Sequence, residues 1–367
     1  MEAIAVIGGN YGDEGKGTVV ARLTSKATNA GKTVINVLTN GGAQRGHSVL
    51  TTTLGDTTYQ HFGSGTEFGA NTYYSSYFIL NPMQFVKEYE SLIVKPKEIL
   101  RHPDCLWTTP YDSFANLISE TLQKRTASCC MGIWNTIRRS KIIHYNFNVF
   151  LLNLSFEGQM DYLQRVKEFY EKEMIIPDKY KPIWNSQVLK IHFLNDCNFM
   201  LTHTHQFKED YCDYDTVIFE NGQGLLLSDT GKDTFDTTPS DTGSTYSKEI
   251  LKHWIGRCGE PLNGFKIHYV TRPYLTRHGD GNITDQVSRN NLSSNIEEDR
   301  TNHHNEFQGE FRYGKLDIKS LVKRFDKDSG GIGYVVDVTH CDEMDRHEEF
   351  DKYFPNRVNY IDTPLVT

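Results

Sequence analysis

Short apolar runs that stop at glycine or at polar residues recur along the chain. The first, Ala3 to Ile7, leads directly into glycine, which is the pattern of a buried parallel strand. Residues 18–23 then have helical spacing, and Thr33 to Leu38 is a second apolar run that stops at a polar loop. Strand, loop, helix and strand in this order predict an α/β sheet.

Later segments extend this pattern. It predicts further strands at 77–80, 216–219, 266–270 and 334–338, and helices at 81–92, 110–125 and 151–175. Residues 280–310 carry few apolar side chains and predict a long functional loop. Without an internal repeat or an evident linker, the chain is expected to form one domain over residues 1–367. We expect a large, mostly parallel central sheet with flanking helices and helical insertions at about 85–210.

Composition excludes several classes of protein. The 367 residues carry 39 basic and 47 acidic side chains, a net charge of −8, which argues against binding to nucleic acid. No apolar run approaches the roughly 18 residues that span a bilayer, and the N-terminus does not have the pattern of a secretory signal. Seven cysteines without a C-x-x-C pair are typical of reduced thiols. These features together predict a cytoplasmic protein.

The loop after the first strand carries the first candidate chemistry. It reads Gly12-Asp13-Glu14-Gly15-Lys16-Gly17 and leads into the predicted helix, where backbone N–H groups and Lys16 can hold a phosphate. It is not a Walker A motif, which requires Ser or Thr after the lysine. The Asp13 carboxylate would repel a phosphate, so it predicts a Mg²⁺ ligand or a proton acceptor. A tight turn with a solvated carboxylate is the alternative.

This loop resembles the G-D-E-G-K-G motif of the adenylosuccinate synthetase family, and five further segments resemble motifs of that family in the same order. They are Gly46–Val49 (A-G-H-T-V in the family), Glu220–Gly224 (E-G-A-Q-G), Thr238–Thr242 (T-S-S-N-T), Thr276–Gly281 (T-R-V-G-x-G) and Thr339–Asp342 (T-K-x-D). Each match is short, but six in order make a strong joint signal. The resemblance implies a fold that is P-loop-like without a Walker A motif.

The resemblance also implies a two-step ligase reaction. GTP, or ATP, with Mg²⁺ phosphorylates the 6-oxygen of a purine nucleoside monophosphate, and the amine of L-aspartate then displaces the phosphate. Asp13 would be the catalytic base and a metal ligand, His47 the general acid, and the carbonyl of Gly46 a second metal ligand. A satisfied polar loop residue is the alternative for His47.

Nucleotide binding is implied for a larger set of residues. Gln223 would donate its amide to the purine 6-oxygen, Thr238 would hold the 5′-phosphate, and Asp342 would accept from guanine N1–H and N2–H₂. A turn residue and a solvated carboxylate are the alternatives for Gln223 and Asp342. The complete set is Gly12, Glu14, Gly15, Lys16, Gly17, Ser128, Arg139, Gln223, Thr238, Thr339 and Asp342.

Two loops depart from the family pattern. Residues 128–133 stand where the family has the substrate-phosphate loop G-T-T-G-R-G, and Ser128 is their only hydroxyl. Arg138 or Arg139 would supply the arginine that family members contribute across a homodimer interface. Residues 305–314 stand where the family binds aspartate with several arginines, and they retain only Arg312. We expect Arg277 and Arg312 to bind the amine donor.

These departures leave alternatives open. The chain ends soon after Asp342, as in compact archaeal members and in phage relatives that join aspartate to dGMP. Asp13 favours an IMP enzyme, since many of those phage relatives have serine there. The acceptor expected first is dGMP, and IMP is expected next. A different amine donor, or a non-catalytic purine-nucleotide-binding regulator, is the remaining alternative.

Overall fold

The computed structural model describes residues 1–51, 55–124, 128–142, 153–207, 213–229, 237–258, 264–299, 301–302, 307 and 309–361, without the side chains of 255–258. The described residues form a nine-stranded sheet in which every neighbouring pair is parallel. The strand order is β16 (Val358–Ile361), β15 (Tyr334–Thr339), β11 (Phe265–Thr271), β1 (Glu2–Gly8), β10 (Thr216–Gly224), β2 (Val34–Leu38), β6 (Asn71–Tyr74), β8 (Ile99–Arg101) and β9 (His205–Gln206). The predicted α/β fold with a large parallel sheet is thereby confirmed.

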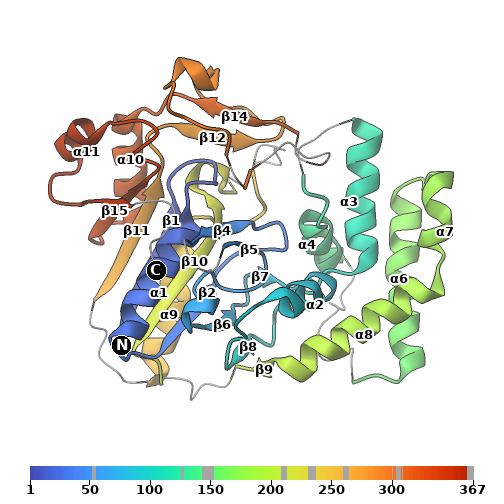
Figure 1. Cartoon of the computed structure of the whole chain (residues 1–367). Coiled ribbons are helices and arrows are strands. Elements are labelled where there is room, and N and C mark those ends of the chain that lie inside the picture. Colours follow the sequence, from blue (N-terminus) through green and yellow to red (C-terminus); the bar gives the residue numbers. More distant parts are fainter. Residues whose placement is uncertain are drawn as a thin grey trace.

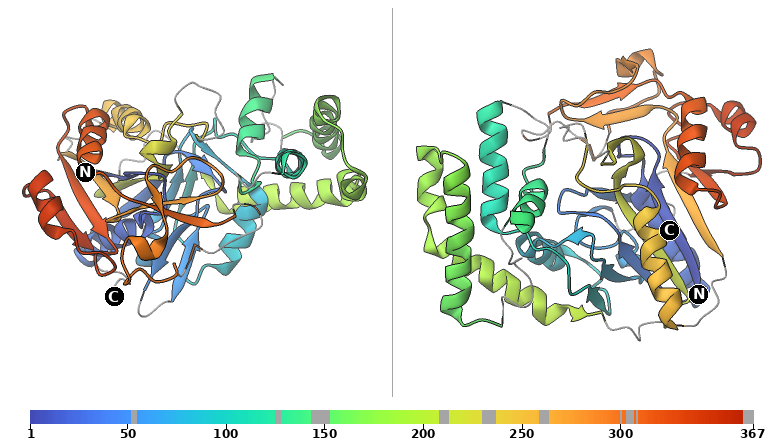
Figure 2. Two further views of the ribbon diagram at one scale, coloured as in Figure 1. Left: turned by 90° about the horizontal axis from the view of Figure 1, so that it is seen from above. Right: turned by 180° about the vertical axis from the view of Figure 1, so that it is seen from behind.

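The central strand β1 is buried on both faces. It lies between β10 and β11, with Ile4 opposite Ile218 and Lys266. Successive side chains of a strand face opposite sides, so Ile4 packs with α1 (Lys16–Asn29) on one face, while Ala5 belongs to the cluster that includes Trp254 of α9 (Thr245–Cys258) on the other. Figures 1 and 2 show these two helices covering opposite faces of the sheet. A continuous apolar run, without alternation, is therefore what this strand requires.

The other helices lie at the two ends of the sheet (Figure 1). Beside β8 and β9 lie α2 (Pro82–Ser91), α3 (Pro110–Gln123), α4 (Ile133–Ile142), α6 (Phe156–Glu173), α7 (Lys181–Trp184) and α8 (Gln187–His203); beside β15 and β16 lie α10 (Ile318–Ser329) and α11 (His347–Tyr353). Short 3-10 helices occur at Thr66–Phe68, Asp178–Tyr180, Leu225–Leu227 and Arg289–Asn291. The single domain with insertions at about 85–210 stays a prediction.

Three small sheets pack around the carboxyl ends of the central strands. They are β3 (Gly41–Gly42) with β7 (Phe78–Ile79), β4 (His47–Leu50) with β5 (Asp56–Tyr59), and β12 (Leu275–His278) with β14 (Phe311–Gly314) and β13 (Gln286–Val287). Because all central strands are parallel, the loops after β1, β2, β10, β11 and β15 open at one edge of the sheet, which is where α/β folds bind ligands.

Local sequence signals explain two of the predicted helices. Thr109 caps α3 in a reciprocal pair with Asp112, and Pro110 occupies the first turn, where its missing N–H costs nothing. Asn81 accepts from the backbone N–H of Gln84 and caps α2 in the same way.

Three expectations need correction. The run at 77–80 forms β7, which pairs with β3 and lies outside the central sheet. Strand β10 continues to Gly224, so its motif residues are part of the strand and do not follow it. The segment 280–310 contains β13 and a 3-10 helix, while positions 300, 303–306 and 308 lie outside the described residues. Among the described helices none is long and apolar enough to cross a membrane.

Candidate active site

The loop after β1 is held in shape by a buried carboxylate. Glu14 accepts hydrogen bonds from the backbone N–H groups of Asn10 (2.8 Å) and Gly12 (2.9 Å) and pairs with Lys16 Nζ at 2.9 Å. Gly12 and Gly15 have φ angles of 108° and 90°, which favour glycine. The loop is therefore a preorganised turn that ends at the N-terminus of α1.

Asp13 stands at the outer side of this turn, and its backbone is also left-handed, with φ 61°. A non-glycine residue in this conformation is uncommon and stores strain that the surrounding contacts must offset. Arg272 Nε donates to the carbonyl oxygen of Asp13 at 2.8 Å. Burial raises the pKa of the Asp13 carboxyl group, while the nearby His278 and Lys16 oppose that rise.

His47 lies at the start of β4 and belongs to a buried charged cluster. Its Nδ1 is 2.5 Å from Glu220 Oε1, and Arg45 Nη2 lies 2.8 Å from the same oxygen and 2.9 Å from Nδ1. Burial would raise the pKa of Glu220, but Arg45 and the hydrogen bonds of His47 and Ser64 lower it to about 2. An ionised carboxylate only accepts, so we place the proton on Nδ1 and leave Nε2 for the cavity.

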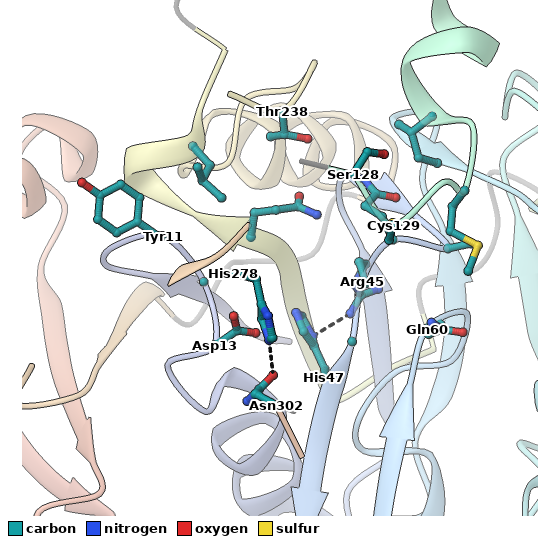
Figure 3. A pocket seen from close by; sticks show the side chains of 18 of the residues that line it. Tyr11, Asp13, Arg45, His47, Gln60, Ser128, Cys129, Thr238, His278 and Asn302 are labelled. Atoms are coloured by element: carbon teal, nitrogen blue, oxygen red, sulfur yellow. Dashed lines mark hydrogen bonds between the residues drawn. The ribbon is translucent and has the colours of Figure 1, made fainter. Parts of the chain in front are cut away.

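Two cavities meet at these loops. The first, of about 380 Å³, and the second, of about 220 Å³, share a wall. The shared residues are Asp13, Lys16, Gly46, His47, Ser48, Thr301 and Asn302. Figure 3 shows Asp13 and His47 reaching toward one space, Asp13 from the loop after β1 and His47 from the start of β4. Groups bound in the two cavities would therefore meet at Asp13 and His47.

The outer wall of the first cavity comes from segments far apart in the sequence. It includes Gln223 and also Ser128, Cys129 and Thr238, which Figure 3 labels. Gln223 has a left-handed backbone, φ 56°, and its Oε1 is buried without a hydrogen-bond partner among the described residues. A buried amide oxygen without a partner costs free energy, which a ligand donor would recover.

The second cavity is lined by the loops after β11 and β15. Arg272 Nη2 pairs with Asp299 at 2.6 Å, and His340 and Asp342 lie on the same wall. Burial lowers the pKa of His340 well below its usual value. Gly17 also lines this cavity, and a Cβ there would meet the Ser48 carbonyl at 2.6 Å, so only glycine fits.

Comparison with known proteins places the chain. The family model for adenylosuccinate synthetase matches residues 5–350. The chain belongs to the adenylosuccinate synthetase family. A curated adenylosuccinate synthetase from Blochmanniella pennsylvanica is 25% identical over 303 residues, which cover 78% of this chain and 65% of that protein. The match thus spans less than two thirds of the curated relative.

Two solved structures share the fold. The fully ligated adenylosuccinate synthetase from Plasmodium falciparum has a TM-score of 0.64 at 18% identity, covering 94% of this chain and 78% of its own. Cyanophage S-2L succinoaminodeoxyadenylate synthetase, solved with dGMP and with dATP as energy donor, has a TM-score of 0.60 at 13% identity. That likeness covers 100% of this chain and 92% of the phage chain. The fold of an adenylosuccinate synthetase is therefore shared along almost the whole chain.

Most of the predicted site residues lie at the two cavities. Of the predicted set, the first cavity includes Gly12, Asp13, Lys16, Gly46, His47, Ser128, Gln223, Thr238 and Arg277, and the second adds Gly15, Gly17 and Asp342. Glu14 and Thr339 act behind the cavities: Thr339 Oγ1 donates to the Glu14 carbonyl at 2.7 Å, and both hold the loop in place. Their predicted contact with nucleotide is therefore indirect in this arrangement.

Arg139 is placed away from both cavities. Its guanidinium binds both carboxylate oxygens of Asp112, at 2.8 and 3.0 Å, and donates to Tyr162 and to the Trp107 carbonyl. This buried bidentate pair uses the fork that a phosphate would need. In this arrangement the Arg139 guanidinium is engaged within its own subunit, and its nucleotide contact stays a prediction. Its neighbour Arg138 is half-exposed on α4 and pairs with Glu173.

The two arginines assigned to the amine donor differ in position. Arg277 lines the first cavity, where its guanidinium lies 4.9 Å from the centre of the Tyr11 ring. Arg312, opposite Arg277 on β14, donates to Gln286 Oε1 at 2.9 Å and to the Gly281 carbonyl. In this arrangement Arg312 supports the small sheet, and Arg277 is the better placed of the two.

Sequence reasoning missed three cavity residues that stand beside or within the motifs. The side-chain oxygen and nitrogen of Gln44 are buried without a hydrogen-bond partner among the described residues. Nε and Nη1 of Arg45 are likewise buried and have no hydrogen-bond partner among these residues. His278 stands where the family motif has valine. A motif match identifies only positions where the residue agrees with the family motif. These three positions differ from the motif or lie just outside it, so the match did not single them out.

The residues at the shared wall fit a magnesium site completed by a ligand. Mg²⁺ prefers oxygen donors and typically binds one or two carboxylates together with phosphates and water. The Asp13 carboxylate and the Gly46 carbonyl supply such donors beside both cavities. In the part of the chain that the structure describes, His, Cys, Asp and Glu form no metal-binding group of three. Phosphate oxygens would complete the coordination.

Proposed function

We propose that this protein is a C–N ligase of the adenylosuccinate synthetase type. It uses GTP, or ATP, with Mg²⁺ to phosphorylate the 6-oxygen of a purine nucleoside monophosphate and then replaces that oxygen with the amine of L-aspartate. The observation that supports this most is the shared wall, where Asp13, Lys16 and His47 face both cavities. A triphosphate in one cavity and a monophosphate in the other would bring donor and acceptor together there.

Asp13 has the properties of the required base. A purine 6-oxygen becomes a good nucleophile once the N1 proton is removed, because the charge moves onto the oxygen. Burial raises the pKa of the Asp13 carboxyl group, which makes it a stronger base than a solvated aspartate. Gln223 lines the same cavity and would orient the 6-oxygen through its amide nitrogen.

His47 would act on the transferred phosphoryl group through Nε2. Burial and the adjacent Arg45 lower the pKa of His47 to about 4, so its imidazole is neutral at pH 7 without ligand. Serving as a general acid requires that the negative charge of bound phosphates raise this pKa. Glu220 holds Nδ1 and thereby fixes the ring orientation.

The phosphates would be held by the loop after β1. Its backbone N–H groups and the start of α1 face the second cavity, and Lys16 Nζ adds a positive charge at the shared wall. Magnesium, when bound at Asp13 and Gly46, would neutralise phosphate charge. Asp342 in the second cavity supports GTP before ATP, because guanine offers two adjacent donors and adenine does not.

For the acceptor we propose dGMP first and IMP next. The likeness to the cyanophage enzyme, whose structure holds dGMP, covers 100% of this chain and 92% of the phage chain, and this supports the former. Asp13, the residue expected in an IMP enzyme, supports the latter. Because Arg312 turns away from the cavity, an amine donor other than aspartate is the second candidate.

A product assay tests the proposal. Purified protein is incubated with Mg²⁺, GTP or ATP, each of dGMP, IMP and GMP, and either aspartate or glycine; phosphate release and product mass are measured. We expect a succinyl-purine nucleotide from one acceptor, and loss of activity in D13N and H47Q. Turnover that survives replacement of both Asp13 and His47 by alanine would contradict the mechanism. Nucleotide binding without any product would indicate the regulator instead.

We also propose a homodimer, following the family. Arg138, half-exposed on α4, is the remaining candidate for an arginine that reaches a partner subunit, since Arg139 is buried. Sedimentation of the wild type and of R138A, with and without nucleotide, checks this, and a monomer under all conditions would contradict it.

A further inference from the structure

His278 is a cavity residue for which the family motif gives no role. It ends β12, beside Arg277, and the corresponding position of the T-R-V-G-x-G motif is valine. Its ring lies 4.8 Å from the Phe311 ring, measured between centroids, and it lines the first cavity. An imidazole has replaced an aliphatic side chain inside the candidate active site.

A chain of hydrogen bonds fixes which ring nitrogen of His278 carries a proton. Arg272 donates to the Asp13 carbonyl (2.8 Å) and to Asp299 (2.6 Å), and Asp299 accepts from the Asn302 side-chain nitrogen at 3.0 Å. A carboxylate only accepts, so the amide nitrogen of Asn302 must face Asp299 and its oxygen must face His278.

The Asn302 oxygen lies 3.4 Å from His278 Nε2, and Figure 3 shows this contact. Because that oxygen can only accept, Nε2 carries the hydrogen. In the neutral imidazole Nδ1 is then an acceptor. Nδ1 is shielded from solvent and has no hydrogen-bond partner among the described residues. His278 Nδ1 is thus a hydrogen-bond acceptor for which the described residues supply no donor.

The position of His278 indicates what that donor is. His278 and Asp13 line the same cavity, and Figure 3 shows the His278 ring beside the carboxylate proposed to meet purine N1. Arg277, its neighbour in the chain, lines the same cavity and is the guanidinium proposed to hold a carboxylate of the amine donor. The amino group has to lie between these two ends in order to reach the purine C6.

We infer that His278 Nδ1 accepts a hydrogen bond from the amino group of the amine donor and orients it toward the purine. This inference rests on the proposed function. Valine at this position would offer no acceptor, so the family's aspartate is oriented there without this contact. His278 thereby becomes a determinant of the amine donor in this protein, acting together with Arg277.

The test compares two substitutions of His278. In H278N the side-chain oxygen can take the position of Nδ1, while H278V installs the residue of the family motif and removes the acceptor. Losing one hydrogen bond to a charged donor corresponds to about a tenfold to hundredfold effect. We expect KM for L-aspartate to rise by about that factor in H278V and by less in H278N, with KM for both nucleotides unchanged.

A second readout isolates the phosphoryl step. Isotope exchange between the bridging and non-bridging β-phosphate oxygens of labelled GTP, measured with purine nucleotide and without amine, should be the same in H278V and wild type. Equal aspartate KM in all three proteins overturns the inference. Loss of exchange in H278V also overturns it, because His278 would then serve the purine or the phosphates.

Failure of the proposed function has a different signature. Wild-type protein would then show no exchange with dGMP, IMP or GMP. In that case calorimetric titration of L-aspartate into wild type and H278V, in the presence of purine nucleotide, decides the inference alone. Weaker binding by H278V supports it, and equal binding, or no binding by either protein, overturns it.

Discussion

The buried pair of Arg45 and Glu220 gives a stability prediction that does not depend on any ligand. Both side chains are 0% exposed, and the Glu220 carboxylate accepts from Arg45 (2.8 Å), His47 (2.5 Å), Ser64 N (2.9 Å) and Ser64 Oγ (2.5 Å). Changing Glu220 to glutamine keeps the shape but removes the only carboxylate that pairs with the buried guanidinium in the described contacts. Removing one partner of a buried pair costs about 3–5 kcal/mol.

The matched variant is R45M, which replaces the guanidinium with an apolar side chain of similar length. Alone, it should also destabilise, because it leaves the Glu220 charge without its cationic partner. In the double variant both charges are absent, so neither the unpaired guanidinium of E220Q nor the unpaired carboxylate of R45M remains buried. We therefore expect the double variant to be more stable than the sum of the single effects predicts, by about 2 kcal/mol or more.

Urea unfolding followed by circular dichroism measures these free energies, and the denaturant slope shows whether the unfolding stays two-state. Additive effects, with a coupling energy near zero, would refute the reasoning. They would mean that Arg45 is paired mainly with solvent or with groups other than Glu220. Single effects below about 1 kcal/mol would refute it as well, since a surface-like pair costs no more than that.

Three further predictions follow from contacts outside this pair. The folded-state pKa of His47 is about 4 and its ordinary value is 6.5, so this group contributes stability above pH 6.5 that is lost as the pH falls toward 4. The free energy of unfolding, measured against pH in wild type and H47Q, checks this. Identical slopes of unfolding free energy against pH in the two proteins would contradict it. Glu88 accepts hydrogen bonds from the backbone N–H groups of residues 60–62, so E88Q should lower the free energy of unfolding in urea by about 1–3 kcal/mol. The control is the exposed Glu90→Gln change, which should leave that free energy almost unchanged. Equal effects of the two changes would contradict the role of Glu88. If Asp342 reads guanine, D342N should raise KM for GTP about tenfold to a hundredfold and leave KM for ATP unchanged in steady-state assays, and equal changes for both nucleotides would remove Asp342 from base recognition.

The parts of the fold that could be predicted from sequence are those whose causes are local. Strand β1 followed by a glycine loop and α1 follows from one apolar run and from backbone conformations that favour glycine. Helix α3 follows from the cap at Thr109 and Pro110. In a parallel sheet such loops necessarily open at one edge, so the convergence of Asp13 and His47 could be expected once the strands were identified.

Elements without a local periodicity could not be predicted. In α8 apolar residues occur around the whole helix: Phe193 and Leu194 are buried, while Val188 and Ile191 are exposed. The apolar pattern therefore does not mark one face, and the helix has no amphipathic signal. Its packing is decided by α2, which precedes it by about a hundred residues in the sequence.

The site shows the same division between local and long-range causes. Arg138 and Arg139 are adjacent in sequence, but Arg139 turns inward and pairs with Asp112, while Arg138 turns outward and pairs with Glu173. Such choices depend on a partner that the local sequence does not name. Sequence comparison finds the motif residues and passes over substituted positions, although these are where the chemistry of this chain can differ from that of its relatives.

Arg45 and His278 are both substitutions of this kind, and both place a group that can be charged beside residues predicted to be catalytic. Arg45 stands where the family motif has alanine and contacts His47 and Glu220. His278 stands where the motif has valine and lies beside Asp13 (Figure 3). A buried guanidinium is retained only where a carboxylate pairs with it, and an imidazole acceptor left without a partner costs free energy. Both side chains line the first cavity, so we expect the specificity of this protein to differ from that of its relatives at these two positions.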